Sequence, residues 1–279
     1  MKSTDRTFSK RKHQQFKEMV WAYYGEHKRA DLSWRKTVDP YRVVVSELML
    51  QQTQVVRVIP KFRDFIKRFP NTKQLAVAPL ADVLRHWQGL GYNRRAKYLH
   101  QCAQIVHNQH GGRWPKTISE LELLPGIGSY TAAAIVAFAY NQPAICVETN
   151  IRTAVIYHYF PDDTRVSEKE LRIVVSETLD VNNTREWYWA LMDFGAFIKR
   201  THGNRSRQSR SYTKQSSFKG SDREIRGAII RTLTERTSAT VKELCGNGFS
   251  KQRVTEQCRR LCREGLIQQV GTNRFSLRS

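Results

Sequence analysis

The chain has few acidic residues, few cysteines and no long apolar segment. Its 279 residues include 25 Asp and Glu against 47 Lys and Arg. No apolar run approaches the roughly 20 residues that a membrane-spanning helix needs, and the N-terminus does not resemble a secretory signal. We therefore expect a soluble, intracellular protein that does not act at a membrane. It would be cytoplasmic and nucleoid-associated in a bacterium, or nuclear in a eukaryote.

The cysteines are too scattered for a disulfide framework. Their number, five, is odd, which suits a reducing compartment. The last three lack a C-x2-C pair and no histidine follows His202, so a zinc site is not expected. Burial within helices explains these thiols better, and we predict no bound metal. The five are Cys102, Cys146, Cys245, Cys258 and Cys262.

The excess of positive charge predicts an acidic partner. The formal net charge is +22, a balance shared by ribosomal proteins, nucleic-acid enzymes and membrane-surface proteins. Charge alone does not separate these classes. Aromatic residues make up 10% of the chain, which argues for folded structure rather than a disordered basic tail.

Residues 13–200 show helical periodicity interrupted by proline and glycine, without a convincing alternating run. This pattern predicts an all-α domain over residues 1–200. The expected helices are 13–27, 41–52, 55–68, 72–77, 80–87, 92–111, 117–123, 129–140, 148–160, 167–178 and 184–198.

The composition changes after Lys199. The stretch from His202 to Ser217 is rich in Ser, Arg and Gln, and no acid occurs between Asp193 and Asp222. Such a segment has too little apolar area to order itself. We expect a basic, flexible linker over residues 201–220, which either only solubilises the chain or also follows DNA phosphates.

A small second domain is expected over residues 221–279. Helices are predicted for 222–236, 241–244 and 250–265, the last with an arginine-rich exposed side, and a hairpin for 266–270 with 274–277. This order resembles a winged helix, a motif that places its third helix in a DNA groove when it binds DNA. Many winged helices dock proteins instead, and both possibilities stay open.

Two segments are poorly explained by packing. One places Glu47 inside an apolar run and follows it with Gln51 and Gln52. The other, Leu124-Pro125-Gly126-Ile127-Gly128, reads as a tight hairpin between helices. Its glycines let successive N–H groups converge on one point, as in a phosphate-binding site that does not depend on base sequence.

Residues 13–198 resemble the catalytic domain of MutY-type adenine DNA glycosylases, in the helix-hairpin-helix endonuclease III superfamily. The resemblance implies a two-lobed helical domain, a monomer, and mismatched or damaged double-stranded DNA as substrate. The matching segments are Pro40-Tyr41, Ser46-Glu47, Leu50-Gln51-Gln52-Thr53, Gly89-Leu90-Gly91-Tyr92, the hairpin, and Met192-Asp193-Phe194-Gly195-Ala196.

The resemblance implies roles for two acids. Glu47 would protonate the adenine so that the base can leave, and Trp34, Val45 and Leu48 could form an apolar pocket that raises its pKa. Glu148 occupies the family's aspartate position and would stabilise positive charge on the deoxyribose. A carboxylate ~4 Å from that charge contributes on the order of 4 kcal/mol, about a thousandfold in rate.

Glu148 departs from the family pattern, because glutamate adds a methylene and about 1.5 Å of reach. Misplacement by ~1 Å can cost about a hundredfold, so either the backbone compensates or the substrate differs. Tyr130 stands where the bifunctional branch carries its lysine nucleophile. Without that amine no Schiff base forms, and we expect a monofunctional enzyme. Tyr130 would lie beside the extruded nucleotide.

Further site residues follow from the same resemblance. Asn150 would hold the second carboxylate in place. Core packing is an alternative explanation for Leu90 and for Tyr92. The residues expected to enter the duplex as the base flips out are Gln51, Gln52, Leu90 and Tyr92. Those expected at the backbone or the pocket are Pro125, Gly126, Gly128, Trp34 and Arg35.

Two family features are missing. The relatives usually carry four cysteines that hold an iron–sulfur cluster, and the first of those positions aligns with Lys199. Because thiolates are required ligands, we predict no cluster and no other cofactor. The Nudix-like domain that senses 8-oxoguanine is replaced by the basic linker and the winged helix, so selectivity for the opposite base stays open.

The sequence is compatible with three functions. The first is removal of adenine mispaired with guanine or 8-oxoguanine, in base excision repair. The second changes the base to thymine or uracil opposite guanine, which Tyr130 also suits, whereas Glu47 favours adenine because a ring nitrogen must be protonated. The third is a catalytically idle DNA-binding regulator, against which the retention of both acids argues.

Overall fold

The computed structural model describes residues 6–246 and 248–278, in which the regular elements are helices and one small sheet. Residues 1–5 of the predicted glycosylase domain lie outside this description. The chain divides into two compact units. Among the described residues no helix is long and apolar enough to cross a membrane. Unit 1 comprises Met1–Pro40, Lys116–Glu122 and Ile127–Lys214, and unit 2 comprises Tyr41–Pro115, Leu123–Gly126 and Gln215–Ser279.

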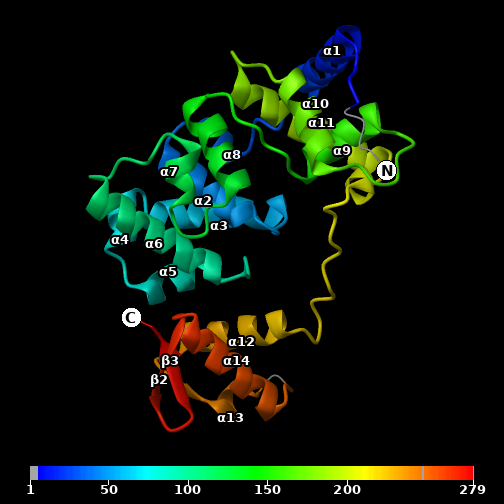
Figure 1. Ribbon diagram of the computed structural model, residues 1–279. Coiled ribbons are helices and arrows are strands. Elements are labelled where there is room, and N and C mark those ends of the chain that lie inside the picture. The colour runs from blue at the N-terminus through cyan, green and yellow to red at the C-terminus, as the bar shows by residue number, and fades with distance from the viewer. Residues whose placement is uncertain (1–5, 247, 279) are drawn as a thin grey trace. The chain divides into compact units, whose positions relative to one another are not determined.

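Unit 1 is built around a long helix, α11, which packs on α1, α8 and α9. The labelled helices α1, α9, α10 and α11 gather together in Figure 1. Aromatic side chains including Phe16 and Trp187 fill this core. Its elements are α1 (Lys10–His27), η1 (Ser33–Lys36), α7 (Ile118–Glu122), α8 (Ser129–Tyr140), α9 (Thr149–Tyr159), α10 (Glu168–Thr178), α11 (Thr184–Thr201) and η2 (Arg205–Gln208).

Helix α8 is apolar on every side and is buried from Thr131 to Ala139. A helix without a polar face belongs inside a core. It ends where Asn141 adopts a left-handed conformation with φ 53°, a typical helix C-terminus. This rigid helix carries Tyr130 in its first turn.

Residues 41–115 of unit 2 form helices, and one of them, α2, is buried along residues Val43–Met49. Helix α6 packs on α4 and on α5, and α3 packs on α5. The bounds are α2 (Pro40–Leu50), α3 (Val55–Arg68), α4 (Thr72–Ala76), α5 (Leu80–Trp87) and α6 (Arg94–Gln109).

The described residues of the C-terminal part of unit 2 form three helices and a three-stranded antiparallel sheet of order β1-β3-β2. The predicted hairpin is confirmed: Ile267 pairs with Leu277 and Gln269 with Phe275, and the two arrows lie together at the red end of Figure 1. The short strand β1, which pairs with β3, was not predicted. The bounds are α12 (Asp222–Glu235), β1 (Ala239–Thr240), α13 (Val241–Leu244), α14 (Lys251–Arg263), β2 (Ile267–Gly271) and β3 (Arg274–Leu277).

Most predicted helices differ from the structure by one to three residues at an end, and three of these differences have a local cause. Helix α1 begins at Lys10 because Ser9 caps it. Helix α2 ends at Leu50 rather than at residue 52, since Gln52 has a φ of 53°. Helix α9 begins at Thr149, with Glu148 as its N-cap.

The first half of the predicted flexible linker is bonded to the rest of unit 1. The side chain of Asn204 accepts hydrogen bonds from the main-chain N–H and the hydroxyl of Ser206. The Arg210 N–H donates to the carbonyl of Val166 at 2.9 Å, and Ser206 and Ser209 are buried. Composition predicted no order here because these bonds depend on individual positions rather than on apolar area.

Candidate active site

The predicted site residues fall into two sets, and the structure places each set within one unit. Nearly all residues of both sets lie at helix ends or in the turns beside them. Unit 2 holds Glu47, Gln51, Gln52, Leu90, Tyr92, Pro125 and Gly126. Unit 1 holds Trp34, Arg35, Gly128, Tyr130, Glu148 and Asn150.

Glu47 is a buried acid in the last turn of α2. Its relative exposure is 8%, and Leu48 and Met49 beside it are fully buried. Charged side chains are seldom buried this far without a partner or a chemical role. The Glu47 carbonyl accepts a hydrogen bond from the Gln51 N–H at 3.2 Å, so the acid and the glutamine turn are parts of one rigid helix end.

The turn after α2 presents its glutamines to the surface. Gln52 is exposed with φ 53°, and Gln51 is half-buried. A non-glycine residue in the left-handed region is uncommon, and such strain is often found at functional sites. The side-chain oxygen of Gln52 accepts a hydrogen bond from the Gln215 amide at 3.2 Å, which a ligand at this turn would have to replace.

A second strained turn follows α5. Gly89, Gly91 and Tyr92 have φ of 91°, 70° and 48°. Tyr92 is half-buried, whereas Leu90 is only 2% exposed. The burial of Leu90 agrees with the core-packing alternative, and its place in a DNA duplex stays a prediction.

The hairpin between α7 and α8 has one glycine that the fold requires. Gly126 has φ 75°, and a Cβ there would lie 2.5 Å from Cδ2 of Tyr98. Gly128 has an ordinary φ of −93° and is the N-cap of α8 without a side-chain cap. The first N–H groups of α8 therefore have no capping side chain, as a helix N-terminus that binds phosphate requires.

Glu148 is both a half-buried carboxylate and a helix cap. Its Oε1 accepts hydrogen bonds from the N–H groups of Asn150 at 2.7 Å and Ile151 at 2.8 Å. Its Oε2 accepts none from a described residue. Burial raises the pKa of Glu148 above its ordinary value, although these two bonds and the charges of Lys199 and Arg152 act to lower it.

Asn150 contacts Glu148 through its main-chain N–H. The predicted role of its side chain in holding the carboxylate stays a prediction. Behind it, a Cβ on Gly195 would lie only 2.0 Å from the Asn150 carbonyl oxygen. Gly195 lies in the Met192–Ala196 motif, and the close approach of α11 to the first turn of α9 is the structural reason for a glycine there.

Arg35 is held in place by an acidic partner in unit 1. Its guanidinium donates to both oxygens of Asp193 at 2.7 and 2.8 Å, and Arg29 donates to the same carboxylate. Burial acts to raise the pKa of Asp193, but Arg35 and then Arg29 hold it below its ordinary value. Trp34 is 7% exposed. Whether either residue lines a base pocket stays a prediction.

The arginines of α14 are largely ion-paired within the C-terminal part. Arg253 pairs with Asp222 at 2.9 Å and Arg260 with Glu256 at 2.9 Å. Exposed pairs of this kind contribute little and exchange readily. They therefore do not prevent a phosphate from replacing the acid, and DNA contact by this helix stays a prediction.

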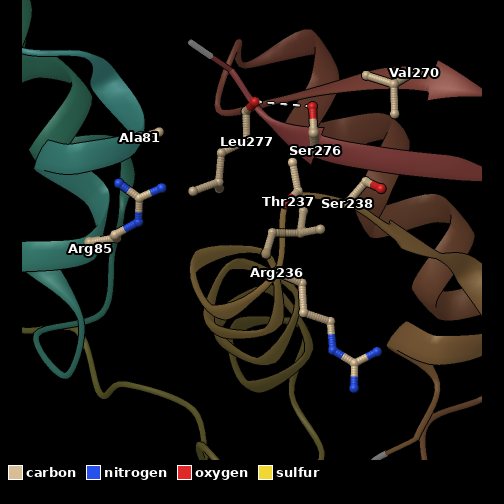
Figure 2. Close-up of a pocket in the computed structure, with 9 residues that line it drawn as sticks. Ala81, Arg85, Arg236, Thr237, Ser238, Val270, Ser276 and Leu277 are labelled. Carbon is tan, nitrogen blue, oxygen red and sulfur yellow. Dashed lines mark hydrogen bonds between the residues drawn. The ribbon is translucent and has the colours of Figure 1, made fainter.

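A pocket of about 390 Å³ lies elsewhere in unit 2 (Figure 2). Arg85 of α5 and Arg236 border it together with hydroxyl side chains of the C-terminal part. None of the predicted site residues lines it. No Asp or Glu is among its lining residues.

Comparisons with known proteins agree with the predicted family. Residues 45–177 match the family described as "HhH-GPD superfamily base excision DNA repair protein". The adenine DNA glycosylase of Mycolicibacterium smegmatis is 31% identical, over 90% of this chain and 92% of that protein. That of Buchnera aphidicola is 36% identical over 66% of this chain, and the match spans only 52% of the relative.

One solved structure shares the fold at appreciable identity. It is a thermostable thymine-DNA glycosylase, 26% identical to this chain with a TM-score of 0.60. The alignment covers 67% of this chain and 88% of that one.

Proposed function

Since this chain belongs to the adenine DNA glycosylases, which are base excision repair enzymes of the HhH-GPD superfamily, we propose that it removes adenine mispaired with guanine or 8-oxoguanine. The observation that carries the proposal is the geometry of Glu148. One oxygen of its carboxylate is fixed by two N–H groups, and the other accepts no bond from a described residue. A fixed carboxylate with one available oxygen suits an electrostatic role toward a positively charged sugar.

Glu47 is the proposed general acid. Its carboxyl group donates a proton to a ring nitrogen of the adenine as the bond between that base and C1′ of the deoxyribose breaks. The bonding electron pair leaves with the protonated base, which departs as neutral adenine. The buried position of Glu47 limits competition from water for that proton.

Glu148 is the proposed stabiliser of the sugar cation. As the base leaves, positive charge develops on the deoxyribose, and the carboxylate faces it with Oε2. Water then adds to C1′ and loses a proton, which leaves an abasic site. The N–H groups that hold Oε1 keep the carboxylate from moving during this step.

Tyr130 supports a monofunctional reaction. It lies in the first turn of α8, where the family's bifunctional branch has a lysine. A phenol does not form a Schiff base with the sugar, so the DNA strand should stay intact after base release. Efficient borohydride trapping of the enzyme on DNA, lost in a Lys-to-Ala scan, would disprove this part of the proposal.

We propose that the enzyme works without an iron–sulfur cluster. The residues after α11 do not fit one, because no cysteine occurs between Cys146 and Cys245 and thiolates are required. Residues 204–211 instead form hydrogen bonds with one another and with the segment that includes Val166. Iron at stoichiometry in purified protein would contradict this.

We assign DNA binding to the hairpin, to the glutamine turn after α2 and to the turn after α5. The hairpin with Gly126 and Gly128 would hold a phosphate, and the turns with Gln51, Gln52 and Tyr92 would enter the duplex. The charge of +22 should make binding fall steeply with added salt.

A second candidate is release of thymine or uracil opposite guanine, which the likeness to a thymine-DNA glycosylase favours. Glu47 argues for adenine, because its proton is needed on a base that leaves poorly as an anion. The deciding experiment measures free base from duplexes with adenine opposite guanine or 8-oxoguanine, and with thymine or uracil opposite guanine. We expect adenine release and an alkali-labile strand. Inactivity on both adenine mispairs would overturn the proposal.

A further inference from the structure

Arg95 is a buried cation that pairs with no acid among the described residues. It lies in the first turn of α6 and is 7% exposed. Burial, with the charge of Arg57 acting in the same direction, lowers the pKa of Arg95 to about 10. The guanidinium is therefore still charged at neutral pH. A buried charge is costly unless hydrogen-bonding groups around it replace water. The acceptors around the Arg95 guanidinium therefore decide whether it can stay buried.

Main-chain carbonyls from two separate turns surround this guanidinium. The atom Nη1 donates to the end of α2 and the glutamine turn, and Nη2 donates to Thr53 and to the turn after α5. The acceptors of Nη1 are the carbonyls of Leu48 at 2.7 Å, Met49 at 2.9 Å and Gln51. Those of Nη2 are the Thr53 hydroxyl at 3.1 Å, the Leu90 carbonyl at 3.2 Å and the Gly91 carbonyl at 3.0 Å.

Arg95 shares three of these acceptors with other donors. The Thr53 hydroxyl donates to the carbonyls of Gln51 at 3.2 Å and Leu90 at 3.4 Å, and the Trp87 indole N–H donates to the Gly91 carbonyl at 3.1 Å. The last carbonyls of α2 have no partner within the helix and carry its negative end. The turn after α5 is left-handed at Gly89, Gly91 and Tyr92, so its carbonyls have no regular strand or helix to bond. A planar group with five N–H donors can serve both turns at once. The ring of Tyr92, centred 5.4 Å from the guanidinium carbon, adds a cation–π contact.

We propose that Arg95 is the positioning residue for base extrusion: it fixes the turn at Gln51–Thr53 and the turn at Gly89–Tyr92 to each other. The inference rests on the proposed function, in which these two turns enter the duplex together. It also ties the backbone just after Glu47 to the same point. The two turns then act as one wedge rather than as two mobile loops.

Arg95→Lys tests this role, because lysine keeps the positive charge but offers a single nitrogen to acceptors on two turns. Single-turnover adenine release is measured on two duplexes with the same adenine mispair. One is otherwise fully paired, and in the other further mismatches flank the mispair, so that less stacking opposes extrusion. We expect about a hundredfold loss on the first duplex and near wild-type rates on the second. Arg68→Lys, an exposed cation on α3, is the matched control.

Thr53→Val is the second variant, in case Arg95→Lys folds poorly. It removes one acceptor of Arg95 and leaves the guanidinium in place, so it should give a smaller loss with the same dependence on the duplex. An equal loss on both duplexes, or none on the first, would overturn the proposal.

Fluorescence separates this inference from the proposed function. An adenine analogue that brightens on leaving the stack is placed at the mispair. If wild type extrudes it without releasing adenine, the proposed function fails, and the extrusion signal of Arg95→Lys still decides the role of Arg95. A wild type that neither extrudes nor releases the base would overturn both.

Discussion

The end of α2 places Glu47 and the start of α9 places Glu148, and groups of opposite charge stabilise these two helix ends. At the end of α2, carbonyls are gathered by a cation, Arg95, that takes no direct part in the reaction. At the start of α9, N–H groups are gathered by the carboxylate of Glu148 itself. The first acid has separate support, whereas the second both supports its helix and carries charge. Substitutions should therefore affect rate alone at one end, and rate together with stability at the other.

Glu47→Gln should have the largest effect on rate. It keeps the volume of the buried side chain and removes the proton, so adenine release should fall by about a hundredfold to ten-thousandfold. Thermal unfolding should change little by comparison. The matched control is Glu26→Gln, an exposed glutamate of α1. Activity retained within about tenfold of wild type would assign the proton to another group.

Glu148→Gln separates charge from capping at the other end. The amide oxygen can still accept from the N–H groups of Asn150 and Ile151, so stability should not fall. The rate should fall by about a thousandfold, since the negative charge is lost. Glu148→Ala removes the cap as well and should cost about 1 kcal/mol in denaturant unfolding. Equal stability of the two variants would show that the cap is unimportant.

Glu148→Asp tests whether adenine release needs the extra methylene of the glutamate. Aspartate is a good N-cap, so stability should be kept, but its second oxygen lies about 1.5 Å closer to the helix. Single-turnover release should slow by up to about a hundredfold. A faster aspartate variant would mean that the glutamate is tolerated rather than used.

Gly195→Ala should disturb the start of α9 from behind. Its Cβ would lie 2.0 Å from the Asn150 carbonyl oxygen, so α11 and α9 must separate, at a cost of about 1–3 kcal/mol and with a slower reaction. Gly227→Ala in α12 is the control, since a Cβ there meets nothing within 4 Å. It should stabilise the protein by up to about 1 kcal/mol. Similar results for both variants would contradict the close contact.

The smallest effect is a dependence of stability on pH. Burial raises the pKa of Glu148 above its ordinary 4.5 in the folded protein, so the folded state binds more protons than the unfolded chain in the window just above 4.5. Its contribution to stability is therefore present below that window and lost as pH rises through it. The unfolding free energy of wild type minus that of Glu148→Gln should fall over this range, while the rate rises as the carboxylate forms. A flat or rising difference would contradict the raised pKa.

Much of the fold could be read from local signals. Ser250 caps the third helix of the C-terminal part. The turn at residues 272–273 joins the two strands of the predicted hairpin. These features depend on residue type at fixed offsets along the chain. The acid Glu47 stood out because a charge within an apolar run needs a reason.

Other features depend on contacts between distant residues. Glutamate is not a common N-cap, so nothing in the residue type predicted the bonds of Glu148. The acceptors of Arg95 are carbonyls, which every residue has, and only the fold decides which ones face a guanidinium. The order of residues 204–211 likewise depends on the matching segment that includes Val166.

The most direct test is a structure of the enzyme on a duplex whose mispaired adenosine is fluorinated and cannot be cleaved. The account predicts that Glu148 keeps Oε1 on the N–H groups of Asn150 and Ile151 while Oε2 lies ~4 Å from the sugar carbon that bears the base, with Glu47 within hydrogen-bonding distance of an adenine ring nitrogen. A Glu148 that leaves its cap, or an adenine that Glu47 does not reach, would contradict it.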